Sequence, residues 1–524
     1  MVQLEDKTYR ELLKERQAQT DENLLLKAEV AWYREQLGLA RKRLYAPKSE
    51  ASPGCQEEML FNEAEARASP ILPDPQTEVI TYTRRKTVGK REQQIENLPV
   101  EDVLYTLPEE EQICPACAGP LHEMGQDIRR EVKIIPAQFI LVRHICSKYA
   151  CRNCNRNEIK TPILAAPMPT SAFPNSLASP SAVAYLMSQK FVEGLPLYRQ
   201  EQALQRLGFE LSRQTMANWM ITGADWLEQI TRRMKTKLLE REVLHADETP
   251  LQVLKEEGRK AQTSSYMWLY RSGRDGPPIV LYDYQQTRAT EHPSRFLKGF
   301  TGYLHVDGYQ VYEKLPGVTP VGCWAHARRN FVDALSVLSP MAKQKGGAAA
   351  HQGLAYCDKL FSIERDLVDV TPEARHAGRL ARSQPVLVEF HAWLEKMALA
   401  VLPKSTTGQA IRYCLNQWTK LTAFMADGRL ELSNNRAERA IKPFVIGRKN
   451  WLFADSPRGA KASATIYSLV ETAKENGLNP MAYLTYLFEV LPNINVKDEK
   501  ALDVLMPWSE TIQEKFKIPS RSSR

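Results

Sequence analysis

Five short apolar runs between Val243 and Phe331 constrain the fold of this chain more than any other feature of its sequence. Each run is rich in β-branched and aromatic residues and is bounded by turn-forming residues, which is the pattern of a β-strand. The runs read VLHADETPLQVL, SYMWLYRSG, PPIVLYDYQQT, GYLHVDGYQVY and TPVGCWAHARRNF. The first three favour antiparallel pairing, and a connector separates them from the last two. This order predicts a mixed sheet.

Two of the predicted strands carry an aspartate. Asp247 lies in the middle of the first strand or just past it, where the turn residues Thr249 and Pro250 begin. Asp307 ends the fourth strand, immediately before Gly308. Either aspartate alone indicates little.

A third carboxylate, Glu438, lies in the segment SNNRAERAIKPFVIGRKNWLF. Asn434 or Asn435 can cap the first turn of a helix there, which would hold Glu438 at a fixed angle. The segment is dense in cations, namely Arg436, Arg439, Lys442, Arg448 and Lys449. These cations fit either a polyanion track beside a metal-binding carboxylate or the ion pairs of a solvated surface helix, and the segment alone favours the second.

Together the three carboxylates match the needs of a two-metal phosphoryl-transfer site. Such a site holds two divalent cations about 3.5–4 Å apart with hard oxygen ligands from separate elements. The strand order suits a ribonuclease-H-like mixed sheet with Asp247 on its first strand and Asp307 on its fourth. The pattern turns helical over 331–428, which predicts a helical insertion before the helix of Glu438. We therefore expect a catalytic core over 240–455.

Length and charge set limits on the chain. Its 524 residues supply material for three or four domains, so we expect a multidomain α+β protein. The formal charge of +8, from 70 Lys and Arg against 62 Asp and Glu, permits a nucleic-acid surface only through clustering. No apolar run reaches the roughly 18 residues of a membrane span, and the N-terminal MVQLEDKTYR lacks a signal-peptide core. We expect a cytoplasmic protein without a membrane partner.

The nine cysteines include two CxxC pairs, in ICPACAG and ACRNC. Two such pairs can complete the tetrahedral shell of one Zn²⁺, and the strand-like QFILVRHI between them suits a zinc ribbon over 108–162. The predicted ligands are Cys114, Cys117, Cys151 and Cys154. His144 and Cys146 lie close enough to be alternative ligands. Redox pairing and unliganded cysteines are the weaker interpretations.

The N-terminal segment 1–48 favours a single helix. A heptad frame from Asn23 places apolar residues on one seam, namely Leu26, Val30, Tyr33, Leu37, Ala40 and Leu44. The seam predicts either a short coiled coil that associates chains or an amphipathic helix packed on its own protein, with little to choose between the two. Residues 49–107 read as a linker that contains a basic run at Thr83–Arg91.

Residues 175–235 read as three helices of a DNA-binding-like domain. Gly208 and Ser212 supply the turn and cap of a helix-turn-helix, and its second helix, Arg213 to Met220, would approach a major groove. Such helix pairs are common in α domains, so DNA recognition is the minority interpretation for this segment alone.

Two features remain in the C-terminal half. The run GCWAHARRNF holds Cys323 and His326, which either bind a metal or form a buried cysteine beside a polar histidine, and the second interpretation is favoured. Residues 456–492 read as two amphipathic helices ended by Gly and Pro, and residues 493–524 read as a polar tail.

With these residues in view, the chain resembles, almost end to end, a bacterial transposase of the insertion-sequence-66 family, a member of the DDE class. The resemblance covers the N-terminal helix with its KSE exit and the two CxxC pairs. It also covers LPLYRQE, HADETP, VDGY, GCWAHARRNF, NNRAERAIKP, GRKNWLF and NPMAYL. Together these motifs are very specific.

The resemblance implies that Asp247, Asp307 and Glu438 form the catalytic triad and bind two Mg²⁺ or Mn²⁺, and that the four CxxC cysteines hold one structural Zn²⁺. It implies DNA as partner, both the element ends and a target duplex. The expected DNA contacts are Arg213, Arg436, Arg439, Lys442, Arg448 and Lys449. We also expect a homo-oligomer, companion proteins encoded by the element and a nucleoid-associated location.

This sequence departs from the family pattern at two places. Ser433 stands where the family often has Asp, and Lys442 stands where it often has Arg. Neither change removes a ligand. Two other functions compete with transposition: a metal-dependent nuclease of the same fold, which would make no joined product, and a DNA-binding repressor, for which Asp247 would not matter.

Overall fold

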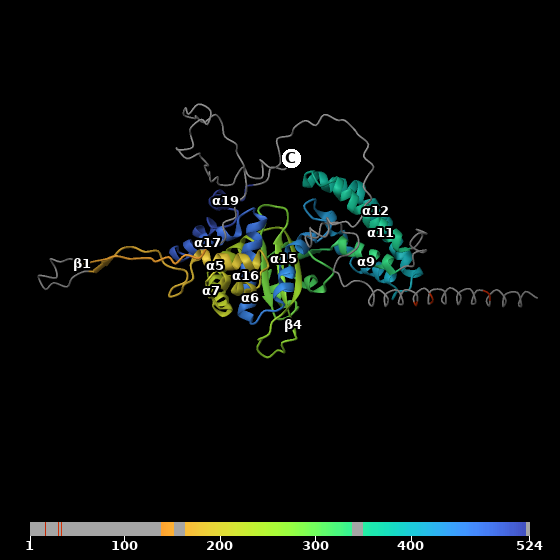
Figure 1. The fold of residues 1–524 in the computed structure, drawn as a ribbon. Helices are drawn as coiled ribbons and strands as arrows, with labels where there is room; N and C mark the ends of the chain where they lie inside the picture. Colours follow the sequence, from red (N-terminus) through yellow and green to blue (C-terminus); the bar gives the residue numbers. More distant parts are fainter. Residues whose placement is uncertain are drawn as a thin grey trace, which may run out of the picture. The chain divides into compact units, whose positions relative to one another are not determined.

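The computed structural model describes residues 138–150, 163–337 and 349–519, together with Arg16, Val30 and Tyr33 (Figure 1). Contacts divide the chain into two units, one of residues 1–46 and 139–524 and the other of residues 47–138. The elements described below all belong to the first unit.

Much of the predicted N-terminal region lies outside the described residues, including the four CxxC cysteines and the linker. Of the predicted seam, Val30 and Tyr33 are described, and both are helical and exposed, to 48% and 61%. The proposed alternative zinc ligand Cys146 donates a hydrogen bond from Sγ to the Ala166 carbonyl oxygen at 3.2 Å. It lies beside a short antiparallel pair, β1 (Lys148–Ala150) and β2 (Ile163–Ala165). The zinc ribbon and the seam stay predictions.

A mixed five-stranded sheet forms the centre of the unit, in the order β5-β4-β3-β6-β7. β3 pairs antiparallel with β4, and β4 with β5, while β6 pairs parallel with β3 and with β7. The strands are β3 (Val243–Gln252), β4 (Ser264–Ser272), β5 (Val280–Gln285), β6 (Gly302–His305) and β7 (Val318–Val321). The short helix α8 (Glu291–Phe296) lies between β5 and β6 in the chain. The mixed sheet is confirmed, but the fifth predicted strand is too long, because β7 ends at Val321 and the rest of that run begins the helix α9 (Trp324–Val337).

Helices that precede the sheet in the sequence and helices that follow it share one hydrophobic core with the sheet (Figure 1). They are α5 (Pro180–Phe191), α6 (Leu197–Arg206), α7 (Arg213–Leu239), α16 (Pro457–Glu475) and α17 (Pro480–Val490), which the turn η4 (Leu491–Asn493) follows. The predicted turn at Gly208 has a φ of +81°, and the Ser212 side chain accepts a hydrogen bond from the Thr215 N–H. The helix after that turn continues well past Met220, because its later residues are buried against the core.

Helix α16 packs along β5, which is one of the two edge strands of the sheet. An edge strand presents unpaired N–H and C=O groups, which are a liability unless another element satisfies them. Thr472 Oγ1 accepts from the Val280 N–H at 3.0 Å and donates to the Val280 carbonyl at 2.9 Å, and Ser468 Oγ accepts from the Tyr282 N–H at 2.8 Å. Two small hydroxyl side chains on α16 therefore bond outer backbone groups of Val280 and Tyr282 on β5.

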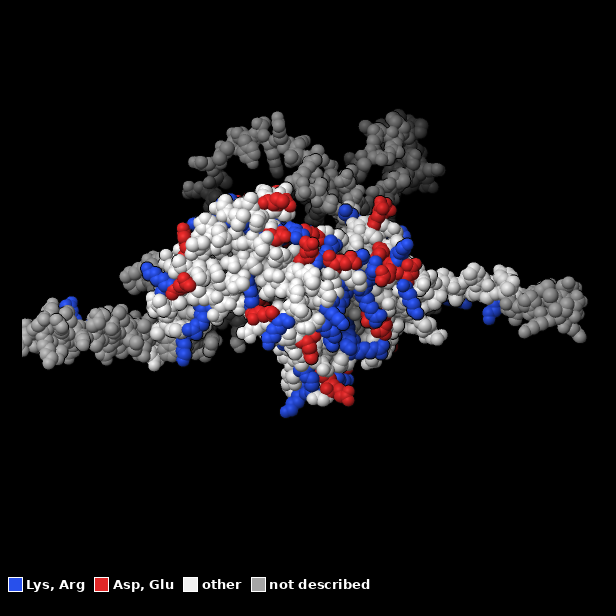
Figure 2. Space-filling view, turned by 180° about the vertical axis from the view of Figure 1, so that it is seen from behind, with Lys and Arg blue, Asp and Glu red and all other residues white. Residues whose placement is uncertain are grey.

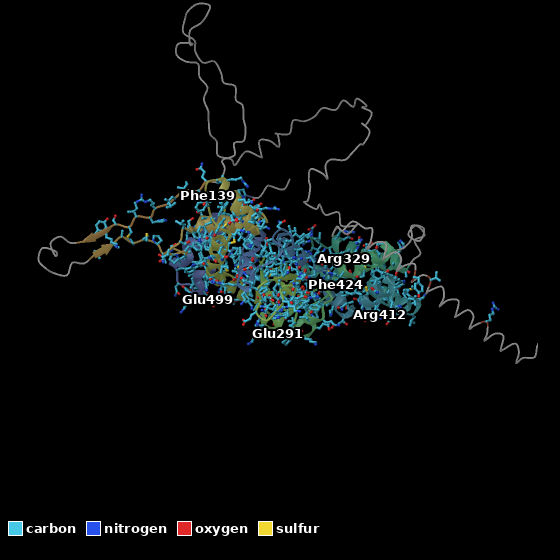
Figure 3. All side chains as sticks on the ribbon, turned by 60° about the horizontal axis from the view of Figure 1, so that its bottom comes forward. Phe139, Glu291, Arg329, Arg412, Phe424 and Glu499 are labelled. Atoms are coloured by element: carbon cyan, nitrogen blue, oxygen red, sulfur yellow. The ribbon has the colours of Figure 1, made fainter. Side chains whose placement is uncertain are left out.

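A second hydrophobic core lies in the helical region between β7 and α15 (Asn435–Trp451). Its elements are α9 (Trp324–Val337), α11 (Ala349–Asp366), α12 (Pro372–Ala400), α13 (Thr406–Asn416), α14 (Trp418–Thr422) and η3 (Ala423–Ala426). Figure 3 marks Arg412 and Phe424 in this region. A helical stretch thus lies where the sequence predicts the insertion.

Two predictions need correction. The fourth strand ends at His305, so Asp307 lies in the following turn, where its Oδ1 accepts from the Tyr309 N–H at 2.9 Å and a 3₁₀ turn, η2 (Gln310–Lys314), begins. The predicted polar tail after residue 493 is wrong up to residue 519. It contains α18 (Glu499–Asp503) and α19 (Glu510–Phe516). Apolar residues of these helices and of the segment between them are buried in the first core, namely Leu502, Leu505, Met506 and Ile512.

None of the described helices combines the length and the apolar character that a bilayer crossing needs.

We expect Ser468→Ala and Thr472→Val each to lower the free energy of unfolding by about 1–3 kcal/mol, because each leaves a buried backbone group of β5 without its partner. Urea unfolding of the full chain measures this. Thr236→Val is the matched control, since Thr236 is exposed and its hydroxyl bonds only the Arg232 carbonyl of its own helix. Equal midpoints for all three variants would contradict the assigned edge contacts.

Candidate catalytic site

Side-chain hydrogen bonds join strand β3 to helix α15 near both ends of the helix. Asn434 Nδ2 donates to the Ala246 carbonyl at 2.8 Å, and its Oδ1 lies 3.0 Å from His245 Nδ1. Further along, Arg448 Nη1 donates to Thr249 Oγ1 at 3.0 Å. Asn434 is thus the residue before the helix, as predicted, but its side chain makes no capping bond and holds the strand instead. Glu438 follows in the first turn of a helix that is fixed against Asp247's strand.

The structure brings the three predicted carboxylates into one electrostatic cluster. Burial raises the pKa of Asp247 well above its usual value, and the charges of Glu248, Asp307 and Glu438 raise it further. Negative charges near a buried carboxylate disfavour its ionised form and so raise its pKa. Asp247 comes from the middle of β3, Asp307 from the turn after β6 and Glu438 from α15. Three separate elements therefore supply the charges that act on Asp247.

Backbone amides fix the two aspartates. Asp247 Oδ1 accepts from the N–H of Glu248 at 2.8 Å, and Asp307 Oδ1 accepts from the N–H of Tyr309 at 2.9 Å. In each case the bond engages one carboxylate oxygen. These bonds restrict the rotation of both side chains, which is how a rigid ligand set is pre-organised.

Glu248 is a fourth carboxylate that the sequence interpretation missed. Its side chain is 2% exposed and pairs with Arg288, while Tyr312 O–H donates to its Oε2 at 2.6 Å. The Arg288 guanidinium lies 3.6 Å from the centre of the Tyr309 ring. Burial raises the pKa of Glu248, and the charge of Asp307 raises it further. The only signal in the sequence was its position next to Asp247.

Two side chains of helix α9 lie close to the Glu438 carboxylate. His326 Nδ1 lies 3.7 Å from Glu438 Oε1, and Arg329 Nη2, marked in Figure 3, lies 3.8 Å from Oε2. Both atoms of the first pair are buried and make no hydrogen bond. Cys323 Sγ also lies within 4.8 Å of the ligand atoms of His326 and Glu438. Burial raises the pKa of the Cys323 thiol to about 11. The sequence singled out Cys323 and His326 but not Arg329.

The predicted DNA-binding cations divide into two groups. Arg436 is paired with Glu431 at 2.7 Å, with its side chain only 22% exposed, and Arg213, at the start of α7, is exposed but pairs with Glu201 at 2.9 Å. Arg448 donates to β3 as described above. The cations exposed on α15 are Arg439, Lys442 and Lys449. On one face of the unit, lysine and arginine side chains gather beside acidic ones (Figure 2).

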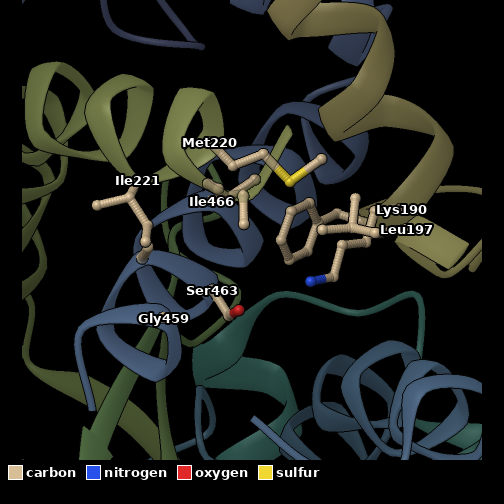
Figure 4. A pocket seen from close by; sticks show the side chains of 10 residues that line it. Lys190, Leu197, Met220, Ile221, Gly459, Ser463 and Ile466 are labelled. Atoms are coloured by element: carbon tan, nitrogen blue, oxygen red, sulfur yellow. The ribbon is translucent and has the colours of Figure 1, made fainter. Parts of the chain in front are cut away.

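A pocket lies elsewhere, between α5, α7 and α16 (Figure 4). Its lining is mostly apolar and includes Phe191, Met220 and Ile466, and none of the three carboxylates lines it. Its cationic residue is Lys190, whose pKa burial lowers to about 8. This pocket is separate from the carboxylate cluster in its residues and in its chemistry.

Comparison with known families identifies most of the chain. Residues 175–462 match the model of the "Transposase IS66 family", and residues 468–508 match the "IS66 C-terminal element". Residues 111–155 match the "zinc-finger binding domain of transposase IS66", and residues 32–103 match "Transposase C of IS166 homeodomain". A zinc-finger domain implies zinc, and a DDE transposase domain implies a divalent metal.

Three proteins of Sinorhizobium fredii are similar over most of their length, and each is described only as uncharacterized. The protein y4jD is 31% identical over 79% of this chain and 80% of its own, and y4qI is 32% identical over 75% and 73%. The protein y4hP is 29% identical over 90% of this chain and 84% of its own. Because the transposase model alone matches more than half of the chain and these relatives align over most of both lengths, the chain belongs to the insertion-sequence-66 family of transposases.

Proposed function

We propose that the chain is a DDE-type DNA transposase that binds the ends of its insertion sequence, cleaves them and joins them to a target duplex in the cytoplasm. The observation that carries this proposal is the electrostatic cluster of Asp247, Asp307 and Glu438, which come from β3, the turn after β6 and α15. Membership of the transposase family supports the reaction class.

The catalytic core is proposed to be ribonuclease-H-like. Support comes from the strand order β5-β4-β3-β6-β7, in which three antiparallel strands are followed by two parallel ones. Asp247 lies on β3, Asp307 lies after β6, and Glu438 lies on α15, a helix that follows the sheet in the sequence. The helical region between β7 and α15 then lies between the second and third members of the triad.

The residues present fit divalent metal. Mutual repulsion and burial make the charged form of Asp247 costly, and a cation at the cluster would relieve that cost. Glu438 Oε1 is buried without a hydrogen bond, so it has a lone pair to give. All the ligand atoms are hard oxygens, which suits Mg²⁺ or Mn²⁺. Asp247, Asp307 and Glu438 would hold two such ions, which when bound supply an activated water and stabilise the departing 3′ oxygen.

The chain's own residues position the ligands and the DNA. The N–H groups of Glu248 and Tyr309 hold Asp247 and Asp307 in fixed rotamers, and α15 holds Glu438. The exposed cations Arg439 and Lys442 on the same helix lie where they can neutralise backbone phosphates. In the joining step the freed 3′-OH takes the place of water as nucleophile. No side chain needs to form a covalent bond to DNA.

Association of chains belongs to the proposal as well. Val30, on the predicted seam of the N-terminal helix, is helical and 48% exposed, which leaves an apolar position for a partner helix to cover. We propose that this helix brings chains together as a homo-oligomer, and that companion proteins of the element assist it.

Neutralising any member of the triad should abolish chemistry while DNA binding survives. We expect Asp247→Asn, Asp307→Asn and Glu438→Gln each to lower the rate of end cleavage and of strand transfer by about a thousandfold or more, because a metal contributes several kcal/mol of charge stabilisation. Cleavage and joining of a labelled element-end duplex measure this, and a mobility-shift assay measures binding.

Glu489→Gln is the control, since Glu489 is an exposed residue of α17. Near-normal cleavage by Glu438→Gln would refute the triad. Cleavage without any joined product would favour the metal-dependent nuclease. DNA binding by the unchanged chain without any cleavage, and binding unaffected by all three variants, would favour the repressor.

Zinc should be structural. We expect about one Zn²⁺ per chain to survive a chelator wash of the reduced protein, and Cys114→Ser to lose that ion and unfold the finger, because metal binding supplies its folding free energy. Elemental analysis and limited proteolysis measure the two effects. Chelator-washed protein that lacks zinc yet resists proteolysis would show that the cysteines serve another purpose.

The exposed and the paired cations of α15 should differ in their effect on DNA binding. Arg439→Gln and Lys442→Gln should each reduce the slope of log affinity against log salt by about 0.9, because each removes one phosphate contact. Arg436→Gln should leave the slope unchanged and instead destabilise the fold, because Arg436 forms an ion pair with the partly buried Glu431. Titrations at several salt concentrations test this, and a smaller slope for Arg436→Gln alone would reverse the assignment.

A further inference from the structure

Three side chains of different chemistry meet beside the carboxylate cluster. The ligand atoms of Cys323, His326 and Glu438, a sulfur, a nitrogen and an oxygen, all lie within 4.8 Å of one another. Cys323 lies two residues after the end of β7 and directly before α9, His326 is in the first turn of α9, and Glu438 is in the first turn of α15. The site therefore forms where two helices begin close together, and each element that supplies a ligand is held by a hydrophobic core.

Two of these atoms lie close together and lack hydrogen-bond partners. His326 Nδ1 and Glu438 Oε1 are 3.7 Å apart, both are buried, and neither makes a hydrogen bond. A buried polar atom left unpaired costs about 1–3 kcal/mol, so such atoms in a folded protein need an explanation. At 3.7 Å a shared proton makes a poor hydrogen bond, whereas a cation between the two atoms would satisfy both.

The sulfur is placed as metal-bound thiolates are. Cys323 Sγ accepts a hydrogen bond from the Asn434 N–H at 3.2 Å, and it precedes the first turn of α9, where peptide N–H groups are unpaired. Burial raises the pKa of this thiol to about 11, so a metal ion that binds the sulfur would displace its proton. The same amide holds the sulfur in place relative to α15, because Asn434 is the residue before that helix.

We propose that Cys323, His326 and Glu438 form a second metal site, which binds a thiophilic divalent cation of the Zn²⁺ class and thereby withdraws Glu438 from the catalytic cluster. One sulfur, one imidazole nitrogen and one carboxylate oxygen are the ligand types of zinc, with one position left for water or a phosphate oxygen. Zinc bonds of about 2.0–2.3 Å place tetrahedral ligands about 3.5 Å apart, so small side-chain rotations from the observed spacing suffice.

The consequence is a competition over one glutamate, and this part of the inference rests on the proposed function. A hard ion at the triad needs Glu438 as an oxygen ligand, while a soft ion at the second site holds the same carboxylate on the side of α9. Zn²⁺ should therefore inhibit Mg²⁺-dependent cleavage, and the inhibition should depend on Cys323 and His326, which are not members of the triad.

Metal binding is tested first, without reference to activity. The full chain with its finger zinc in place is titrated with Co²⁺, and we expect one additional Co²⁺ per chain with a thiolate-to-cobalt absorption band. Elemental analysis before and after shows that the finger zinc has not exchanged. Cys323→Ser should lose the band, and His326→Ala should weaken Co²⁺ binding by at least about tenfold.

Cys357→Ser is the matched control, since Cys357 is also a buried cysteine but lies on α11 outside the cluster. Circular dichroism checks the fold of each variant. If Cys323→Ser does not fold, His326→Ala and Glu438→Gln, which change partly exposed side chains, carry the test. An unchanged cobalt spectrum in Cys323→Ser, or unchanged affinity in both other variants, overturns the proposal.

Inhibition is tested second. For each protein, cleavage with Zn²⁺ is expressed relative to that protein's own rate without added Zn²⁺. The Zn²⁺ concentration that halves cleavage should be at least about tenfold higher for His326→Ala than for the unchanged chain. If the band appears but no preparation cleaves DNA, the metal site stands and the proposed function fails. If cleavage depends on the triad but no extra Co²⁺ binds, the proposed function stands and the second metal site is refuted.

Discussion

The site depends on the side chain of one buried asparagine. Asn434 is 1% exposed, and it joins three elements: its amide nitrogen donates to the Ala246 carbonyl, its amide oxygen faces His245 Nδ1, and its backbone N–H donates to Cys323 Sγ. Because an amide oxygen only accepts, the contact with His245 requires the proton on Nδ1. The start of α15 is thereby fixed to β3 and to the segment after β7, and the direction of Glu438 follows from that start.

Two glutamates seven residues apart show how local surroundings separate structural from reactive carboxylates. Burial acts to raise the pKa of Glu431, but the neighbouring His245 and the Arg436 guanidinium outweigh it and hold that pKa far below its usual range. Glu431 is therefore a satisfied anion. Glu438 has one oxygen without a hydrogen bond and only a 3.8 Å contact from Arg329 to the other. A carboxylate oxygen that accepts no hydrogen bond has lone pairs with which it can coordinate a metal ion.

The sequence predicted the strands well because their apolar alternation is a local signal that burial on a sheet enforces. It placed Asp247 correctly for the same reason. It extended the strand of Asp307 too far, because GYLHVDGYQVY stays apolar while the Asp307 side chain bonds the Tyr309 amide and turns the chain. It also offered Asn434 or Asn435 as the cap of helix α15. The Asn434 side chain instead bonds Ala246, which is 188 residues away in the sequence, so the bond leaves no local pattern. The partners of Glu438 on α9 were invisible for the same reason.

The helical region between β7 and α15 also takes part in setting the site. Arg379 is fully buried, and its guanidinium donates to both carboxylate oxygens of Glu364 and to three backbone carbonyls. These carbonyls belong to Phe424, Asp427 and Leu430, at distances of 2.7 to 2.9 Å. They lie on the segment that leads into α15, so one side chain of α12 fixes the path by which the chain reaches Asn434. A guanidinium can hold five acceptors in one plane and a lysine cannot. The packing of this helical region therefore decides where α15 begins, and with it the position of the third carboxylate relative to the first two.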